Sequence, residues 1–310
     1  MARRRKCAGR DVNGIVIIDK PAGASSNEVL QRVKRLYGAT RAGHTGSLDP
    51  LATGVLPVCL GRATRLSQYL LDSDKSYRAV ARLGVRTATG DSEGKVMQVR
   101  PVATTERDIE AVLEQFRGPG QQIPSMYSAI KHHGQPLYKL AREGIEVERK
   151  ARPVNIYRLA MTAFRGDEIK LEVDCSKGTY IRTLVEDIGE MLGCGAHVTD
   201  LRRLKAGPYC EGASFTLEAL DQAHDSGGHQ ALDELLVPQD SAVSQMPAVS
   251  LEEADTVRLL QDRSVRMSCT PAPASGFVRI YRSMIDAPDV FLGIGEITDE
   301  GLVVLRRLIE

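Results

Sequence analysis

The chain of 310 residues has no tryptophan and no apolar run of the roughly 20 residues that a membrane helix needs. Its basic N-terminal stretch is not followed by the apolar segment of a signal peptide. These absences argue against a membrane anchor and against secretion. We therefore expect a cytoplasmic protein.

Cysteine is sparse, and its six copies are scattered along the chain. They form no C-x-x-C pair and show no Cys/His spacing that is typical of zinc sites. Disulfides are not expected in a reducing compartment. We expect mostly buried, apolar cysteines and no metal site.

Four widespread catalytic signatures are also missing, namely G-x-x-x-x-G-K-[ST], G-x-G-x-x-G, G-x-S-x-G and H-E-x-x-H. Their absence argues against nucleotide hydrolysis, dinucleotide redox chemistry, serine hydrolysis and zinc proteolysis. A serine nucleophile at Ser176 has no assignable base. The sequence therefore gives no motif that supports any of these four enzyme classes.

The net charge is only +1, but it is distributed unevenly. Residues 1–210 hold 34 Lys and Arg against 23 Asp and Glu, a net charge of +11, whereas residues 211–310 hold 7 against 17, a net charge of −10. Such an asymmetry is typical of a chain whose basic part meets a polyanion. The alternative is that it only distinguishes two domains of different surface composition.

Short strands interleaved with helices are predicted along the first two thirds of the chain. Apolar patterns predict strands at 13–19, 76–85, 152–163, 168–175 and 197–205, and helices at 25–37, 63–71, 105–116 and 179–192. The Gly- and Pro-rich segment 43–50 is predicted to be a loop. This order favours an α+β fold over a doubly wound sheet.

The composition changes near residue 222, where linker-like sequence begins. A helix at 251–261 and strands at 277–283, 289–296 and 301–308 predict a small β-rich domain. We expect a flexible basic leader (1–12), a large main domain (13–222), a linker (223–245) and a small C-terminal domain (246–310). Few contacts should cross the boundary near residue 246.

Asp49 is the only carboxylate between residues 29 and 71, a stretch that holds six Arg and Lys. Nearby positive charge keeps a carboxylate ionised in a dry site, and an ionised carboxylate is what a nucleophile must be. The alternative is structural, because an Asp before Pro50 can simply form an Asx turn. Local pattern alone leaves both interpretations open.

Several segments, in order along the chain, resemble the motifs of bacterial TruB-type tRNA pseudouridine synthases. They are DKP (19–21), GHTGSLDPLATG (43–54) with LGRATR (60–65), YLLDSDKSY (69–77), CSKGTYIRT (175–183), and GCGAHV (193–198) with LRRL (201–204). The segment FLGIGEITDEGLVVLRR (291–307) resembles a PUA-type RNA-binding module. Together these motifs are far more specific than any single loop.

The resemblance implies a pseudouridine-synthase fold of the α+β class, with a mixed, mainly antiparallel sheet and flanking helices, plus a PUA-like β domain. It also implies that uridine 55 in the T arm of tRNA becomes pseudouridine. The N-glycosidic bond breaks, the flipped base turns, and C5 rejoins C1′. This isomerisation involves no redox change and no group loss, so no cofactor is expected. A stand-alone monomer without protein partner or guide RNA is implied as well.

The resemblance makes Asp49 the catalytic carboxylate. Whether it adds to the uracil ring, adds to C1′ or abstracts a proton from the sugar stays open. Arg182 would ion-pair with Asp49, although a helical arginine can also form an ordinary surface salt bridge. Tyr77 would stack on the uracil, although a strand tyrosine can equally be a core residue.

Four further positions follow from the same motifs. Tyr180 and Leu201 would line the uracil pocket, and Leu201 is indistinguishable by pattern from an ordinary core residue. His44 would fill the gap left by the flipped base or hold the displaced RNA. Lys20 would support the site or meet a phosphate.

A second hypothesis is a non-catalytic module that binds or folds tRNA and keeps the pocket without the chemistry. The complete set of Asp49, Tyr77 and Arg182 favours the enzyme, because a pure RNA binder gains nothing from a carboxylate that faces phosphates.

Overall fold

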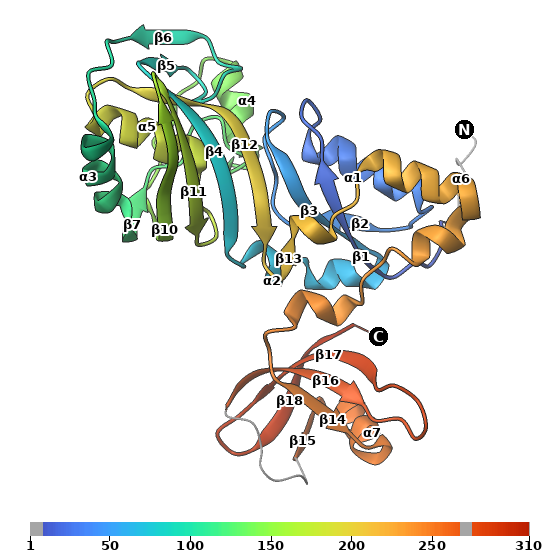
Figure 1. The fold of residues 1–310 in the computed structure, drawn as a ribbon. Coiled ribbons are helices and arrows are strands. Elements are labelled where there is room, and N and C mark those ends of the chain that lie inside the picture. Colours follow the sequence, from blue (N-terminus) through green and yellow to red (C-terminus); the bar gives the residue numbers. More distant parts are fainter. Residues whose placement is uncertain (1–8, 267–274, 310) are drawn as a thin grey trace.

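The computed structural model describes residues 9–266 and 275–309, which form a large sheet with flanking helices and a smaller C-terminal β domain (Figure 1). Residues 1–8 of the expected leader lie outside the described residues. The rest of that leader is anchored rather than free, because Arg10 ion-pairs with Asp233 and its backbone bonds Gly38. No helix in the described ranges is long and apolar enough to cross a membrane.

The large sheet has nine strands in the order β1-β3-β12-β4-β11-β10-β7, with β2 paired to β3 and β13 paired to β12. Its strands are β1 (Gly14–Lys20), β2 (Ala42–His44), β3 (Thr53–Leu60), β4 (Lys75–Leu83), β7 (Gly118–Gln122), β10 (Arg152–Arg165), β11 (Glu168–Cys175), β12 (Ala196–Ala206) and β13 (Tyr209–Cys210). Only the β3–β12 pair is parallel. The sheet is therefore mixed and mainly antiparallel, as predicted.

The parallel pair joins the two halves of the sheet at a very close backbone approach. Gly54 pairs with Arg203 and has a φ of +99°. A Cβ at Gly54 would lie 2.2 Å from the carbonyl oxygen of Arg203, so only glycine fits. This contact fixes the start of β3, and with it the preceding loop, against β12.

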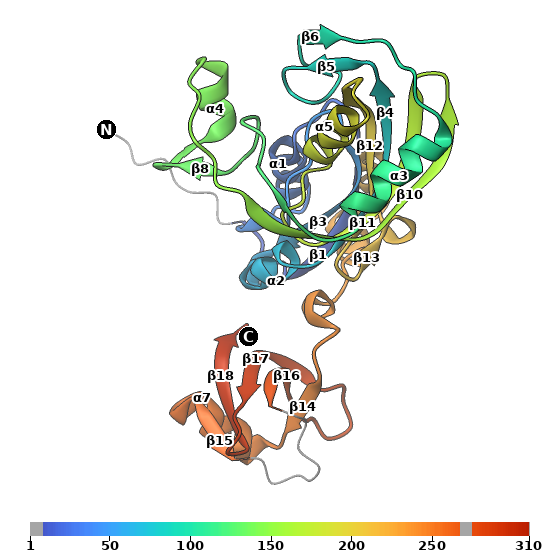
Figure 2. The same ribbon diagram turned by 90° about the vertical axis from the view of Figure 1, so that its left-hand side faces the viewer.

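Helices cover the two halves of this sheet (Figures 1 and 2). The covering helices are α1 (Ser26–Leu36), α3 (Glu106–Phe116), α5 (Ile181–Met191) and α6 (Leu217–Asp233). α1 and α6 contact β3 and β1, while α3 and α5 contact β10 and β12. Capping boxes at Ser25 and Thr105 define the first turns of α1 and α3.

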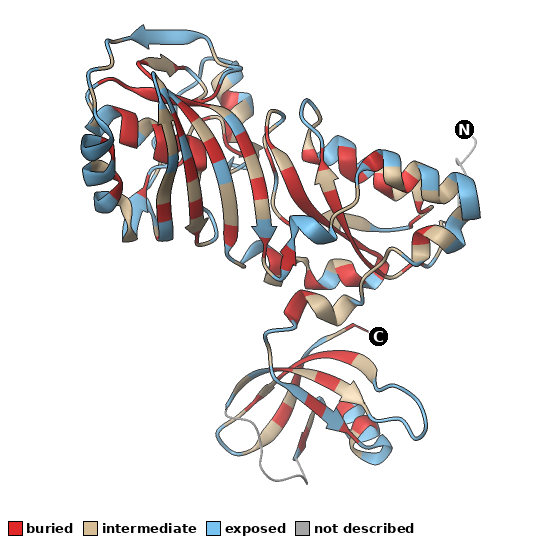
Figure 3. Cartoon of the chain, in the orientation of Figure 1, coloured by how far each residue is buried: buried red, intermediate tan, exposed pale blue. Residues whose placement is uncertain are grey.

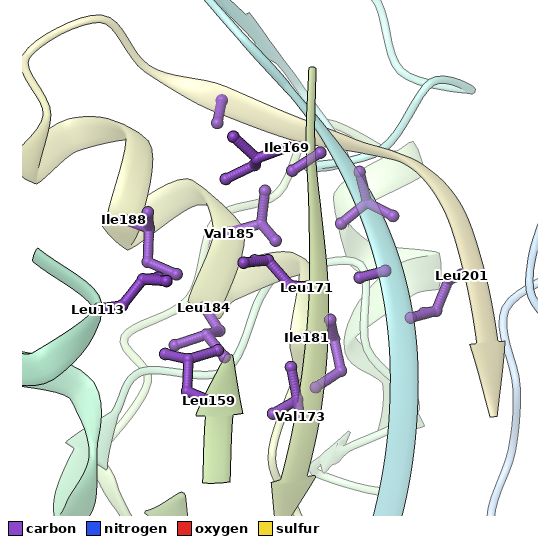
Figure 4. Packing of buried hydrophobic residues seen from close by; sticks show 14 of the residues in the cluster. Leu113, Leu159, Ile169, Leu171, Val173, Ile181, Leu184, Val185, Ile188 and Leu201 are labelled. Atoms are coloured by element: carbon purple, nitrogen blue, oxygen red, sulfur yellow. The ribbon is translucent and has the colours of Figure 1, made fainter. Parts of the chain in front are cut away.

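The core beneath α5 extends over the half of the sheet formed by β4, β10, β11 and β12 (Figure 4). Leu184, Val185 and Ile188 of α5 pack in one cluster with residues of β4, β10, β11 and β12. Leu48 and Leu201 belong to the same cluster. The apolar face of α5 is therefore fixed, and so is the direction of the polar side chains in its first turn.

Strand β1 is buried on both faces (Figure 3). Val16 and Ile18 face the helices α1 and α6, and Ile15 and Ile17 face the opposite cluster. Alternation of period two with both faces apolar gives a nearly continuous hydrophobic run. This explains why the sequence around β1 shows no polar face.

The C-terminal domain is a five-stranded sheet in the order β14-β16-β17-β18-β15 with one helix. Its elements are β14 (Ala248–Leu251), α7 (Glu253–Asp262), β15 (Ser264–Arg266), β16 (Gly276–Arg282), β17 (Val290–Ile297) and β18 (Leu302–Leu308). The three predicted strands and the helix are confirmed to within a few residues. β14 and β15 were not predicted, because each is short and has no long alternating pattern.

This small domain docks on the large N-terminal domain through apolar contacts. Ile294 and Ile309 are buried in one cluster with Ile17 and Leu66. The Nη1 of Arg65 also donates to the carbonyl of Leu308 at 2.9 Å. Among the described residues, the contacts that cross the boundary near residue 246 are limited to this small area, which agrees with the expectation that few contacts cross it.

The segment 223–245, expected to be a linker, is largely helical. Residues 223–233 continue α6, and η3 (Gln239–Val243) is a short 3-10 helix. Leu232 is fully buried, and its carbonyl accepts a bond of 2.9 Å from the Tyr37 hydroxyl. The Gly-rich sequence makes a kink at Gly228, whose φ is +62°, instead of a linker.

The remaining elements are short and lie between the larger ones. They are η1 (Gly61–Leu66), α2 (Ser67–Leu71), β5 (Val85–Thr87), β6 (Val96–Val99), β8 (Lys131–His132), β9 (Gln135–Pro136), α4 (Leu137–Arg142) and η2 (Glu211–Ala213). α4, β8 and β9 form an arm beside the sheet (Figure 2).

Candidate active site

Asp49 lies on the loop between β2 and β3, and neighbouring backbone bonds hold this loop in place. The Ser26 hydroxyl donates to the Leu48 carbonyl at 3.1 Å and accepts from the Leu48 amide at 2.7 Å. The Ala52 amide donates to the Asp49 carbonyl at 3.0 Å. Leu48 and Ala52 are both buried. The carboxylate thus stands between two anchored residues.

Arg182, in the first turn of α5, holds the carboxylate of Asp49 with two hydrogen bonds. Its Nε lies 2.9 Å from Oδ2 and its Nη2 lies 3.1 Å from Oδ1. This fork geometry fixes the plane of the carboxylate as well as its position. The side chain of Arg182 is only 5% exposed, whereas that of Asp49 is 36% exposed. The acid therefore faces the open side of the pair.

Asp91 is a second carboxylate on the same guanidinium, and the sequence did not reveal it. Its Oδ2 lies 3.1 Å from the Nη1 of Arg182, and its side chain is 4% exposed. The carbonyls of Thr89 and Tyr127 accept further bonds from Arg182 at 2.9 and 3.0 Å. Arg182 is thereby held from behind while it holds Asp49.

Burial and charge act in opposite directions on Asp49. Burial raises the pKa of Asp49 above its ordinary value, while Arg182 lowers it, Asp91 raises it and Lys20 lowers it. Burial is the largest of these effects, so the carboxylate is a stronger base than a solvated aspartate. Its ionised form nevertheless has a dedicated partner in Arg182.

A pocket of about 420 Å³ opens beside the Asp49–Arg182 pair. Its lining includes Tyr77, Tyr180 and Leu201 as well as the ion pair itself. Pockets that bind small ligands commonly have volumes of about 300–1,000 Å³. The pocket is thus large enough for a nucleobase, with a carboxylate at its wall.

Three protein-family models together match residues 34–244 and 247–309. Residues 34–181 match the TruB family pseudouridylate synthase N-terminal domain, residues 182–244 the tRNA pseudouridylate synthase B C-terminal domain, and residues 247–309 the pseudouridine synthase II TruB C-terminal domain. Proteins named tRNA pseudouridine synthase B are similar over nearly their whole length. That of Aeromonas salmonicida is 52% identical (100% of this chain, 97% of the relative), and that of Pseudomonas fluorescens is 54% identical (97% and 96%).

The chain belongs to the TruB family of pseudouridylate synthases. Its fold also resembles a chain in the crystal structure of a Cbf5–Nop10–Gar1 complex, with a TM-score of 0.71, 25% identity, and coverage of 96% of this chain and 85% of that one. The predicted pseudouridine-synthase fold with a C-terminal β domain is therefore confirmed.

Three of the residues expected in a TruB-type pocket do lie in it. Tyr77 on β4, Tyr180 before α5 and Leu201 on β12 line the same cavity as Asp49. Leu201 is 4% exposed and also belongs to the core cluster, so the two interpretations of this residue are compatible. Burial raises the pKa of both tyrosines, so both are neutral near pH 7.

Lys20 lies behind the catalytic loop and is fully buried. Its Nζ donates to the carbonyls of Pro21 at 2.8 Å, Ala24 at 2.6 Å and Pro50 at 3.2 Å. Burial lowers the pKa of Lys20 to about 8, although Asp49 raises it. Of the two expected roles, meeting a phosphate does not fit a side chain without exposure. The support of the loop at Pro50 does fit.

His44, on β2, does not line the Tyr77 pocket. It borders a second pocket of about 480 Å³, which shares Asp49 and Arg182 with the first. In the described part of the chain its Nδ1 is buried without a hydrogen-bond partner. Burial, followed by the charge of Arg203, lowers the pKa of His44, so the ring is neutral. His44 is thus placed next to the ion pair and not inside the pocket with Tyr77.

Asp91 could not be assigned to the site from the sequence alone. Asp91 lies in a Gly-flanked turn after β5, much as Asp49 lies in a Gly-flanked loop. That resemblance is the one local signal for Asp91. The contact itself depends on how β5 and α5 meet in space, which no spacing along the chain encodes.

Proposed function

We propose that this chain converts uridine 55 in the T arm of tRNA to pseudouridine, with Asp49 as the catalytic carboxylate. The observation that carries the proposal is the Asp49–Arg182 pair in a nucleobase-sized pocket next to Tyr77. The base to be modified is covered in stacked RNA, so it must be flipped into this pocket. The relatives named tRNA pseudouridine synthase B support tRNA as the substrate.

In the proposed reaction Tyr77 stacks on the uracil without fixing its rotation, which the chemistry needs. Asp49 acts on the ring, on C1′ or on a proton of the sugar, and Arg182 keeps it oriented. Tyr180 and Leu201 complete the wall of the pocket. Atoms are only rearranged, so no cofactor or metal takes part.

A basic rim supports RNA binding next to the pocket. Ile130 lines the uracil pocket and also a neighbouring hollow whose wall includes Lys131, Arg149 and Lys150. Cations at such a rim attract phosphates and position a nucleic acid without reading its sequence. His44, at the second pocket beside Asp49, is placed to occupy the gap that the flipped base leaves or to hold the displaced RNA.

We further propose that the chain acts in the cytoplasm as a monomer, without a protein partner or guide RNA. The similarity to the matched relatives extends over at least 96% of their length, which supports a chain that acts with the same set of parts as they have. The docked C-terminal domain would contribute shape-specific contacts to tRNA, since its neighbourhood is net acidic.

The test is to incubate the purified protein alone with an unmodified tRNA transcript and to map pseudouridine by carbodiimide-blocked primer extension. A single stop at position 55, absent from a transcript that carries cytidine there, is the expected result. Tight tRNA binding without any stop would identify the chain as a binding or folding module instead.

A further inference from the structure

Arg203 is a buried cation that the proposed roles above do not use. It is 1% exposed, and its Nε and Nη2 donate to the carbonyls of Val55 at 2.7 Å and Gly46 at 3.1 Å. No carboxylate lies within ion-pair distance of it in residues 9–266 and 275–309. A charge that is buried without a counter-ion is costly. Its presence therefore calls for an explanation.

Its neighbour Arg202, in contrast, has carboxylate partners that compensate its charge. Arg202 points to the other face of β12 and bonds both oxygens of Asp19 at 2.9 Å and Glu211 at 2.9 Å. Successive residues of a strand face opposite sides. The same strand thus carries one arginine that is fully compensated and one that is not.

The uncompensated arginine faces the uracil pocket. Arg203 pairs in register with Tyr77 across β12 and β4, which places the two side chains on one face of the sheet. Arg203 lines the same pocket as Asp49 and Tyr77. Burial raises the pKa of Tyr77, and the charge of Arg203 and its contact with the phenol hydroxyl oppose this shift.

The other two buried cations of this wall are already occupied, Arg182 by Asp49 and Asp91 and Lys75 by backbone carbonyls. The ammonium of Lys75 donates to the carbonyls of Leu70, Leu71 and Ser73, which matches its three N–H donors. Arg203 has five donors, of which the Val55 and Gly46 bonds use two and the contact with the Tyr77 hydroxyl engages a third. Arg203 is therefore the cation of the pocket wall that has donors left for a ligand.

We propose that Arg203 stabilises the negative charge that uracil acquires while it is detached from the sugar. When the N1–C1′ bond breaks, its electron pair leaves with N1 and spreads over the ring to O2 and O4. When C5 then bonds C1′, the ring returns an electron pair. The proton on C5 is then lost and N1 takes up a proton, which restores the aromatic base with no net change in atoms or charge. A fixed cation in a water-excluded site is most effective against such transient charge. This inference rests on the proposed isomerisation of uridine.

The test compares two leaving groups in three variants. Single-turnover rates are measured with a transcript containing uridine and with one containing 5-fluorouridine, whose fluorine stabilises the uracil anion. Loss of the starting nucleoside is followed in nuclease digests, because the fluorinated adduct has no C5 proton to lose. The variants are Arg203→Gln, Arg203→Lys, which keeps the charge, and the matched control Arg202→Lys on the other face of the strand.

We expect Arg203→Gln to slow the reaction of uridine by about 100-fold or more, as for other preorganised donors. The fold-loss of rate for 5-fluorouridine should be at least tenfold smaller. Arg203→Lys should show a smaller loss with the same dependence on the leaving group, and Arg202→Lys should affect both substrates equally. Equal losses for both substrates in Arg203→Lys would overturn the proposal and leave Arg203 as a clamp between Gly46 and Val55. This second variant decides the matter even if Arg203→Gln does not fold. Failure of the wild-type protein to convert uridine would instead refute the proposed function itself.

Discussion

The Nη1 atom of Arg182 lies 3.1 Å from the Oδ2 of Asp91, a residue that does not line the pocket of Tyr77. Asp91 is itself fixed, since its Oδ1 accepts from the Glu93 amide at 3.1 Å and from the Thr89 hydroxyl. Arg182 is thereby oriented by one carboxylate and orients another. The position of Asp49 depends on a turn that does not touch the pocket of Tyr77.

Replacement of Asp91 by asparagine should lower kcat by about 10- to 100-fold while tRNA affinity changes little. Asparagine keeps the size of the side chain but weakens the charge-assisted bond to Arg182, so Asp49 is held less firmly. Single-turnover rates and filter-binding affinities measure the two quantities separately. Asp167→Asn, on the exposed turn between β10 and β11, is the control. An unchanged kcat in Asp91→Asn would show that Arg182 needs no second carboxylate.

Replacement of Ile309 by aspartate should lower the free energy of unfolding by about 2–5 kcal/mol. Ile309 is 1% exposed and packs between the two domains, so the change removes an apolar contact and buries a charge. Ile285→Asp is the matched control, since Ile285 is 92% exposed and should tolerate the change within about 0.5 kcal/mol. Urea unfolding measures both. Equal effects at the two positions would mean that the domains do not dock as described.

The free energy of unfolding of the wild-type protein, compared with that of a Lys20→Met variant, should increase as the pH rises from about 8 to 10.5. Burial lowers the pKa of Lys20 to about 8 from its ordinary value of 10.5. Between these values the unfolded chain binds the proton that the folded chain has lost, so stability rises with pH. The measurement is urea unfolding of both proteins at pH 7.5 and pH 10. A difference in unfolding free energy that stays constant between these pH values contradicts a buried, desolvated ammonium.

Much of the fold could be predicted because local pattern and tertiary packing agree. α1 carries its capping box at Ser25, and the apolar face of α5 reads directly as helical spacing. β3 was not predicted, because Gly54 and Pro57 interrupt its apolar run, and the need for Gly54 comes from Arg203 across the sheet. The linker predicted at 223–245 was wrong, because tertiary packing overrides the local Gly-rich pattern. Its Gly-rich kink lies inside a helix that Leu232 anchors from a distance.

The same distinction holds for the pocket. The resemblance of the motifs brought Asp49, Tyr77, Tyr180 and Arg182 to one site, and the structure places them together. Asp91 and Arg203 could not be assigned in this way. Their importance lies in contacts with residues far along the chain, and neither stands out from the many acidic and basic side chains of the sequence.

Binding of tRNA should weaken steeply as the salt concentration rises. Residues 1–210 carry a net charge of +11, and each phosphate contact that they make releases counter-ions. The logarithm of the binding constant should therefore fall with the logarithm of the salt concentration, with a slope of about −0.7 to −0.9 per contact. Affinity measured between 50 and 300 mM KCl gives this slope. A flat response would show that the charge asymmetry has no part in RNA binding.

The most direct test of the account is the conversion of tRNA by Asp49→Asn. The amide has nearly the same shape as the carboxylate but cannot act as the nucleophile or base, so pseudouridine formation should fall below a few per cent of wild type while tRNA affinity stays within about tenfold. Asp225→Asn, at a side chain that is 86% exposed, should leave both quantities unchanged. Pseudouridine is mapped by carbodiimide-blocked primer extension on an unmodified transcript. An Asp49→Asn protein that still modifies the tRNA at more than a few per cent of the wild-type rate would contradict the central role of Asp49.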